Sequence, residues 1–299
     1  MNGAAAPSPW LPTAPCVPGR CTAHEPVRPP GPPGDPAGVL RALARLVAGL
    51  GTVALGLLCA PAAGLLPIAA RHALVRRWTR AAVRAFGVRV RHEGADPATG
   101  PLLVAANHVS WLDILLVATV LPGRTIAKKE VRGWPVLGLL AALGGTLFLD
   151  RDRLRALPGT VRTVSGVLAG GGRVVVFPEG STWCGRARGR FRPAVFQAVL
   201  DSRATVQPVR VEYEPTDSAA YVGPDPLAAS VRRIVTTRRL TAVVRLGEPL
   251  PGPRYPDRRA LAAAAQRAVA RDSANLPPLS VHQRSRSSPA AASSVRTPA

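Results

Sequence analysis

A histidine and an aspartate stand five residues apart in the segment NHVSWLD, residues 107–113. The segment directly follows the apolar run 102–106, so His108 is expected where a strand ends and a helix begins, a usual place for functional groups in open α/β sheets. If the chain is helical from residue 109, the Asp113 carboxylate lies about one turn away and can orient one ring nitrogen of His108 while the other accepts a proton. The pattern indicates a general base. A pair that only caps a helix is the alternative that the spacing leaves open.

A second apolar strand leads into a carboxylate and a glycine, in the segment FPEGST at residues 177–182. Pro178 is expected to end the strand, and Gly180 allows a close approach of the backbone to a ligand. The segment GRARGRFR at residues 185–192 follows, and its arginines suit phosphate groups. Taken singly, Glu179 is equally consistent with an ordinary loop carboxylate, and the basic segment with a solvated loop.

Two further segments carry groups of interest. The two lysines of the chain, Lys128 and Lys129, stand side by side, and a short apolar run downstream ends at Arg151, whose guanidinium is suited to bind phosphate. The segment VQPV at residues 206–209 places a proline inside a strand, which is typical of an edge strand or a bulge.

The elements that position these groups follow from hydrophobic periodicity. Short apolar runs predict strands, and the longer stretches between them predict helices. The strands are expected at 88–90, 102–107, 173–178, 205–211 and 240–246, and the helices at 111–121, 134–144, 153–169, 191–200 and 257–272. This alternation predicts an α/β fold with a mostly parallel central sheet flanked by helices.

The composition combines a large apolar fraction with strong positive charge. Of 299 residues 47% are hydrophobic, which excludes a wholly disordered chain, and 39 Lys+Arg against 17 Asp+Glu give a net charge of +22. Such a charge implies an anionic partner, either a nucleic acid or a membrane surface. Aromatic residues make up only 4%, which argues against a base-stacking surface. The scattered cysteines suggest neither a disulfide framework nor a metal site.

An uncharged stretch of 25 residues, 46–70, points to the membrane. It is long enough to cross a hydrocarbon core of about 30 Å. Pro61 and Pro67 interrupt it, so two helices dipping into one leaflet fit as well as one spanning helix, and a buried core helix is a third alternative. Residues 71–92 then hold seven arginines and no acid, which places this side at the cytoplasmic face, next to anionic headgroups.

These observations divide the chain into four parts. Residues 1–37 are a Pro-rich segment expected to be disordered, and 277–299 are a disordered tail. Residues 38–86 form an apolar and basic helical segment that anchors the chain to the membrane. Residues 87–276 form the catalytic domain.

Together the four motifs resemble those of the glycerolphosphate acyltransferase family, in particular its bacterial 1-acylglycerol-3-phosphate acyltransferase branch. NHVSWLD has the NHxSxxD form, and the stretch from Lys128 to Arg151 matches the second block. FPEGST and VQPV match the third and the last. The resemblance covers about residues 75–250. It implies transfer of an acyl group from acyl-CoA or acyl carrier protein to the sn-2 hydroxyl of lysophosphatidic acid, which gives phosphatidic acid.

The resemblance also implies roles for single residues. His108 would be the general base and Asp113 the group that orients it. No covalent intermediate is needed, because a thiol is a good leaving group, and the absence of a G-x-S-x-G nucleophile motif argues against a serine hydrolase. The residues expected to bind substrate are Asn107, Ser110, Lys128, Arg151, Glu179, Gly180 and Ser181. No metal and no cofactor besides the acyl donor are expected. Membrane lipids are the expected partners, at the cytoplasmic face of the cell membrane, and nucleic acid is not.

One departure concerns the acceptor. The family commonly has Thr-Arg after the Glu-Gly, whereas this chain has Ser181-Thr182. The missing arginine is replaceable by Arg186, Arg188 or Arg190. The Ser-Thr form also resembles lyso-ornithine-lipid acyltransferases, as do residues 219–223 with Ser230. A lyso-ornithine lipid is therefore the alternative acceptor, and a non-catalytic basic membrane-binding or nucleic-acid-binding protein is a remote alternative function.

Overall fold

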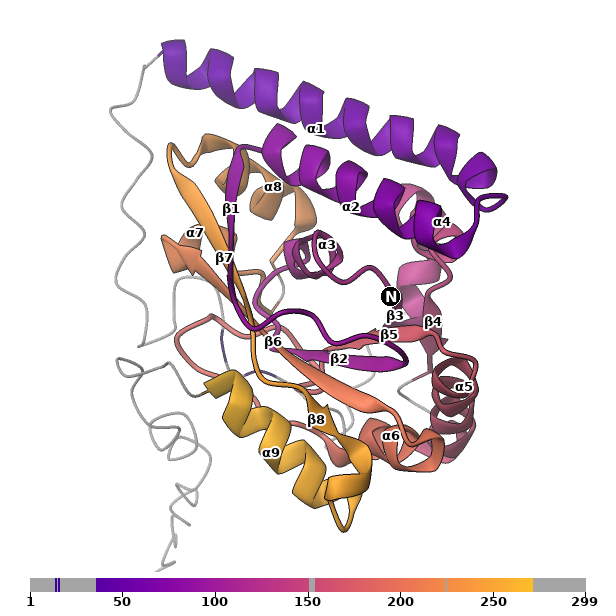
Figure 1. Ribbon diagram of the computed structural model, residues 1–299. Helices are drawn as coiled ribbons and strands as arrows, with labels where there is room; N and C mark the ends of the chain where they lie inside the picture. Colours follow the sequence, from indigo (N-terminus) through magenta and orange to yellow (C-terminus); the bar gives the residue numbers. More distant parts are fainter. Residues whose placement is uncertain (1–13, 15, 17–35, 151–153, 224, 271–299) are drawn as a thin grey trace, which may run out of the picture.

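A central sheet lies between two layers of helices (Figure 1). The computed structural model describes residues 14, 16, 36–150, 154–223 and 225–270. The strands are β1 (Val88–Gly94), β2 (Leu102–Ala106), β3 (Arg124–Lys128), β4 (Leu147–Leu149), β5 (Arg173–Val176), β6 (Thr205–Glu214), β7 (Leu240–Leu246) and β8 (Leu250–Pro251). The helices are α1 (Pro36–Ala63), α2 (Ile68–Ala85), α3 (Leu112–Ala118), α4 (Pro135–Leu143), α5 (Leu157–Ala169), α6 (Phe196–Ser202), α7 (Thr216–Ala219), α8 (Leu227–Thr236) and α9 (Arg258–Ala270).

The strand order is β1-β7-β6-β2-β5-β3-β4, and β8 pairs with β6. The strands β6, β2, β5, β3 and β4 are adjacent in this order and parallel to one another. β7 and β8 run antiparallel to β6. The predicted α/β fold with a mostly parallel sheet is therefore confirmed. Because these parallel strands share one direction, the residues that follow β2, β3 and β5 meet at one edge, which we call the carboxyl edge; the opposite edge is the amino edge.

Two apolar cores lie on opposite faces of the sheet. Leu102, Val104 and Ala106 of β2 pack with α2, α3 and α8, whereas Leu103 and Ala105 pack with α5, α6 and α9. All five residues of β2 are fully buried, because helices cover both faces of this central strand. The sequence of β2 is therefore a continuous apolar run and does not alternate between apolar and polar residues.

All five predicted strands are present. β3 and β4 went unpredicted because they are short, and β3 also has polar ends. α8 went unpredicted although Leu227, Val231 and Ile234 form a helical stripe.

The expectation of an edge strand at VQPV was wrong, because β6 has neighbours on both sides. The pairing does shift by one residue beside Pro208, from Val206–Leu250 to Val209–Leu246, as at a bulge. Pro208 lies inside β6, between the pairing with β8, which ends at Val206, and the pairing with β7, which begins at Val209.

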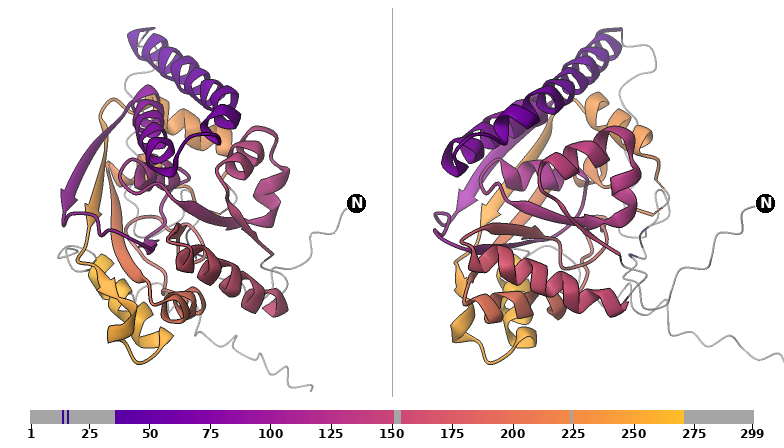
Figure 2. Two further views of the ribbon diagram at one scale, coloured as in Figure 1. Left: turned by 45° about the vertical axis from the view of Figure 1, so that its right-hand side comes forward. Right: turned by 90° about the vertical axis from the view of Figure 1, so that its right-hand side faces the viewer.

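The apolar N-terminal stretch forms a hairpin of α1 and α2, with Pro61 inside the last turn of α1. α1 lies along the surface of the domain (Figures 1 and 2). The Arg45 guanidinium donates to the carbonyls of Val235 (2.9 Å) and Thr237 (2.7 Å) at the end of α8. Further along α1, the Trp78 indole donates to the Thr52 carbonyl over 2.9 Å. α1 is thus held to the catalytic domain through Arg45 and to α2 through Thr52.

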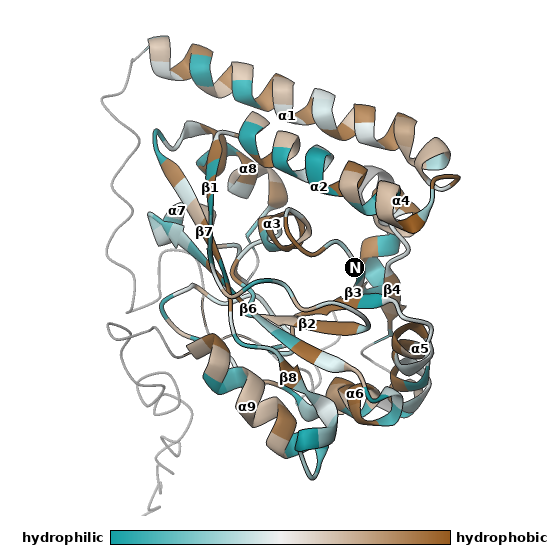
Figure 3. Cartoon of the chain, viewed as in Figure 1, coloured by the Kyte–Doolittle hydropathy of each residue, from teal (hydrophilic) through white to brown (hydrophobic). Residues whose placement is uncertain are grey.

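α1 is nevertheless not a core helix. It is the one helix in the described part of the chain that is long and apolar enough to cross a membrane, and only 6% of its most apolar window is buried. Apolar residues predominate along its second half (Figure 3). Large exposed apolar side chains continue from α1 through the turn into α2, namely Val39, Leu40, Leu43, Val47, Leu50, Leu55, Leu58, Leu65, Leu66, Ile68 and Leu74.

Candidate active site

His108 and Asp113 touch at the carboxyl edge, just after β2. The Nδ1 atom of His108 lies 2.8 Å from Oδ2 of Asp113. The side chain of Asp113 is fully buried, whereas that of His108 is 18% exposed. With its Nδ1–H donated to the carboxylate, the imidazole presents Nε2 as a proton acceptor. This is the geometry of a general base and its orienting carboxylate.

The loop between β2 and α3 is folded around the same carboxylate. The backbone N–H groups of Val109 and Ser110 donate to Oδ2 of Asp113 over 2.7 and 2.8 Å. α3 begins at Leu112, one residue after the predicted start at residue 111, so residues 109–111 belong to the loop. Asp113 therefore holds the loop and contacts the histidine at once, but it does not cap α3, whose N-cap residue, Trp111, has no side-chain hydrogen bond to the helix.

Tyr213 completes the surroundings of Asp113. Its hydroxyl donates to Oδ1 of Asp113, and the side chain is buried. β6 is ten residues long and extends beyond the end of β2, whose last residue, Ala106, pairs with Val209. Tyr213 shares a face with Val209 and Val211, so it meets Asp113 above the carboxyl edge. Sequence reasoning missed this residue, although a polar aromatic residue at the end of a long apolar strand was the available signal.

Tyr213→Phe is expected to lower kcat about 10-fold, because the Asp113 carboxylate loses a donor that holds it in position beside His108, and a hydrogen bond to a charged group is worth about 1.5–3 kcal/mol. Without the Tyr213 hydroxyl, the Asp113 carboxylate stabilises the protonated form of His108 more strongly. The acid limb of the pH–rate profile therefore moves to higher pH. Kinetics from pH 5 to 9 measure both effects. Tyr255→Phe, on the opposite core, is the matched control. An unchanged pH profile would show that the hydroxyl does not act through Asp113.

Glu179 supports His108 from the other side. Its Oε2 accepts the backbone N–H of His108 over 3.0 Å, and the side chain is only 3% exposed. Phe177 stacks on the imidazole at 4.1 Å between ring centroids, with 19° between the planes. The FPEG segment thus packs against the histidine and its backbone. Burial, opposed by the His108 N–H and the Arg188 charge, raises the pKa of Glu179 to about 8.

The raised pKa makes stability depend on pH. The folded chain holds a proton on Glu179 up to about pH 8, whereas the unfolded chain releases it near the ordinary glutamate pKa of 4.5. The free energy of unfolding therefore falls as pH rises through this window. Glu179→Gln is expected to remove this fall, which is on the order of a few kcal/mol. Denaturant unfolding at pH 5.5 and 8 measures it, with the exposed Glu248→Gln as control. Equal pH slopes in wild type and Glu179→Gln would contradict the prediction.

The other predicted substrate-binding residues fall into two groups. Asn107 and Ser110 are buried, and the amide of Asn107 bonds both backbone groups of Val211 (2.9 and 2.8 Å), so it joins β2 to β6. Lys128, Gly180 and Ser181 line the cavity described below. Gly180 has a φ of +77°, a backbone conformation that favours glycine. Arg151 lies outside the described residues.

The arginines proposed as replacements for the family's arginine have three different environments. Arg186 pairs with Asp217 over 3.1 Å, and Arg190 is exposed. Burial, with Arg210 nearby, lowers the pKa of Arg188 to about 10. None of the three lines the cavity, but Arg192 of the same segment does. No group of three His, Cys, Asp or Glu side chains able to hold a metal ion occurs in the described ranges.

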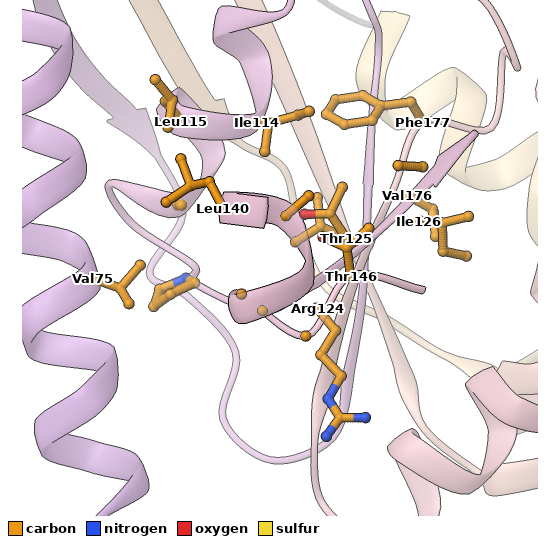
Figure 4. A pocket seen from close by; sticks show the side chains of 18 of the residues that line it. Val75, Ile114, Leu115, Arg124, Thr125, Ile126, Leu140, Thr146, Val176 and Phe177 are labelled. Carbon is orange, nitrogen blue, oxygen red and sulfur yellow. The ribbon is translucent and has the colours of Figure 1, made fainter. Parts of the chain in front are cut away.

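A cavity of about 2350 Å³ opens beside His108 and extends beneath the α1–α2 hairpin. Its walls are largely apolar and include Ile114 and Leu115 of α3 and Leu140 of α4 (Figure 4). Phe177 and Arg124 lie at opposite ends of the side chains drawn there. A cavity of this size and lining suits a hydrocarbon chain whose reactive end lies at His108.

Comparisons with known proteins agree with this site. Residues 87–212 match the family model named Acyltransferase. The chain is 35% identical over 247 residues to a lyso-ornithine lipid O-acyltransferase of Pseudomonas aeruginosa, covering 77% of this chain and 92% of that protein. It is 37% identical over 166 residues to a 1-acyl-sn-glycerol-3-phosphate acyltransferase of Neisseria gonorrhoeae, covering 53% and 64%.

A solved structure is similar as well. The 1-acyl-sn-glycerophosphate acyltransferase PlsC of Thermotoga maritima superposes with a TM-score of 0.60 at 18% identity, over 85% of this chain and 98% of that one. At this identity the likeness concerns the fold. The long match to the Pseudomonas enzyme, together with the family model over the His108 and Glu179 motifs, decides membership: the chain belongs to the PlsC-like acyltransferase family and is an O-acyltransferase.

Proposed function

We propose that this enzyme transfers a fatty acyl group from acyl-CoA or acyl carrier protein directly to a hydroxyl of a lysolipid. The observation that carries the proposal is the position of the His108–Asp113 pair at the mouth of a large apolar cavity. A buried carboxylate behind the imidazole favours proton uptake at Nε2, and the cavity accommodates an acyl chain.

In the proposed reaction, Nε2 of His108 removes the proton of the acceptor hydroxyl as its oxygen attacks the thioester carbonyl carbon. Asp113 balances the positive charge that develops on the imidazole. The tetrahedral intermediate collapses, the C–S bond breaks, and the thiolate takes the proton back from His108. A thiolate is a good leaving group, so the scheme includes neither an acyl-enzyme nor a metal or other cofactor.

The proposal names two candidates for the lysolipid that accepts the acyl group. Lysophosphatidic acid is the acceptor that the four motifs imply, and we retain it as the first candidate. A lyso-ornithine lipid is the second, favoured by Thr182 in place of the family's arginine and by the length of the match to the Pseudomonas enzyme. Both acceptors carry an anionic group and a free hydroxyl, and Lys128 and Arg192 line the cavity with suitable charge.

We also propose that the α1–α2 hairpin lies in the cytoplasmic leaflet of the cell membrane. Exposed apolar side chains along α1 and the turn favour contact with lipid, and the arginines of α2 favour anionic headgroups. The contacts of Arg45 and Thr52 hold α1 along the domain, which favours a hairpin in one leaflet over a helix that spans both. In this proposal, the anionic partner of the excess positive charge is the membrane surface and not a nucleic acid.

The test is an acceptor panel. Purified enzyme is given one acyl-CoA with lysophosphatidic acid, lyso-ornithine lipid or lysophosphatidylcholine, and products are identified by mass. Formation of phosphatidic acid alone supports the first candidate, and formation of ornithine lipid alone supports the second. The panel is repeated with acyl carrier protein that carries the same acyl group. If no lysolipid is acylated with either donor, the proposed function is wrong.

A further inference from the structure

A series of direct contacts connects α1 to the loop that carries His108. α1 packs on α2, and α2 packs on α3 (Figure 1). Within α1, all of which the structure describes, Gly49 is the one buried residue. A methyl group built at Gly49 would lie 2.5 Å from the ring of Phe86, so a larger side chain there must displace this ring. α1 therefore rests directly on Phe86.

Phe86 in turn contacts Trp111. Phe86 follows the last residue of α2 and is 3% exposed. The two rings meet edge to face, with 5.7 Å between centroids and 84° between planes, which is a favourable arrangement for an aromatic pair. The indole N–H of Trp111 donates to the hydroxyl of Ser230 on α8 over 3.2 Å, and Ser230 is fully buried. The indole is thus held by a ring beside the hairpin and by a hydroxyl of the domain.

Trp111 belongs to the loop that forms the pair of His108 and Asp113. It follows Ser110, whose N–H donates to Oδ2 of Asp113, and it directly precedes α3, which carries Asp113. A displacement of Trp111 would therefore alter the 2.8 Å contact between Nδ1 of His108 and Oδ2 of Asp113. Closely packed side chains transmit such displacements, because there is little free space to absorb them.

From these contacts we infer that Trp111 is a positioning residue of the active site, through which α1 and Phe86 help to set the geometry of His108 and Asp113. The inference rests on the proposed role of His108 as the base. α1 also carries the exposed apolar side chains that we assign to the membrane. The hairpin that contacts lipid is then at the same time a support of the catalytic loop.

Gly49→Leu tests the contact of α1 with Phe86, and Gly51→Leu is the matched control. Both variants add the same apolar side chain to α1, but a methyl group built at Gly51 meets no atom within 4 Å. Both should therefore bind phosphatidylglycerol vesicles equally. Gly49 is not among the described residues that line the cavity, so KM should change little. In neutral detergent Gly49→Leu is expected to lower kcat about tenfold, and Gly51→Leu to leave it unchanged.

The pH–rate profile of Gly49→Leu supplies a readout that a general loss of stability would not move. If the contact between His108 and Asp113 loosens, the carboxylate stabilises the imidazolium less. The acid limb of the profile is therefore expected to move to lower pH in Gly49→Leu and to stay in place in Gly51→Leu.

Hydrogen exchange of the loop tests the inference without any substrate. The backbone N–H groups of Val109 and Ser110 are bonded to Asp113, so they exchange slowly while the loop is in place. Gly49→Leu is expected to speed exchange in the peptide that contains them about tenfold, and Gly51→Leu is not. If the wild type acylates no lysolipid, the proposed function fails, and this exchange experiment still decides whether α1 holds the loop.

Ser230→Ala is a second variant that serves if Gly49→Leu does not fold. It removes the acceptor of the Trp111 indole, and Ser230 is not among the described residues that line the cavity. Its kcat is expected to fall about fivefold, as for the loss of one hydrogen bond. Ser230→Thr keeps the hydroxyl and should retain most of the activity. The control is Ser202→Ala, whose hydroxyl donates to Ala198 within α6.

Three results would overturn the inference. The first is that Gly49→Leu and Gly51→Leu turn over and exchange alike. The second is faster exchange of the loop in Gly49→Leu without a loss of kcat, because the loop would then move without consequence for the reaction. The third is wild-type turnover in Ser230→Ala, which would show that the position of Trp111 does not matter.

Discussion

His108→Ala is expected to lower kcat about 10⁴-fold, at the upper end of what a general base supplies. The imidazole is the group beside the cavity that combines a free Nε2 with a buried carboxylate behind it. Binding of the acyl donor should change little, because the cavity wall is otherwise intact. The ring that stacks on Phe177 is lost, so a small loss of stability is expected as well.

Turnover of acyl-CoA with the preferred lysolipid, at saturating concentrations, measures this effect. His92→Ala is the matched control, because His92 lies on β1 outside the cavity and contacts Thr119. Partial recovery of activity by added imidazole would support the role in proton transfer. Turnover within tenfold of wild type would exclude His108 as the base.

Asp113→Asn is expected to have the second largest effect, a loss of about 10²- to 10⁴-fold in kcat with the fold retained. Oδ2 of Asp113 accepts three hydrogen bonds, one from the ring Nδ1–H of His108 and two from the backbone N–H groups of Val109 and Ser110. In the variant, the amide oxygen of the asparagine should occupy the position of Oδ2. The amide NH₂ group cannot, because it is itself a donor and would face three other donors there. The histidine tautomer is then preserved, and what is lost is the negative charge that stabilises the imidazolium.

Kinetics and unfolding of Asp113→Asn separate catalysis from structure. Unchanged KM and far-UV circular dichroism with reduced kcat are the expected result, and Asp201→Asn on α6 is the control. A double-mutant cycle with Tyr213→Phe adds a second criterion, because Tyr213 is expected to act through Asp113 and the two effects should not add. A loss of only a few-fold in Asp113→Asn would show that the charge does not assist His108.

Much of the site was predictable because motifs follow strands. The apolar runs at 102–106 and 173–176 predicted β2 and β5, and parallel strands bring their carboxyl ends to one edge, so the proximity of His108 and Glu179 could be expected. The role of Glu179 was not predictable. Its contact with the His108 N–H depends on how the FPEG loop turns after β5, which local periodicity does not report.

The sequence by itself determined the alternation of strands and helices, the order of the four motifs, the apolar stretch near the N-terminus and the excess of arginine, because these are local patterns. Only the tertiary structure decided which distant residues meet. Tyr213 joins Asp113 across 100 residues because β6 is the neighbour of β2. Strand order arises from the packing of the whole domain, and no single segment carries it.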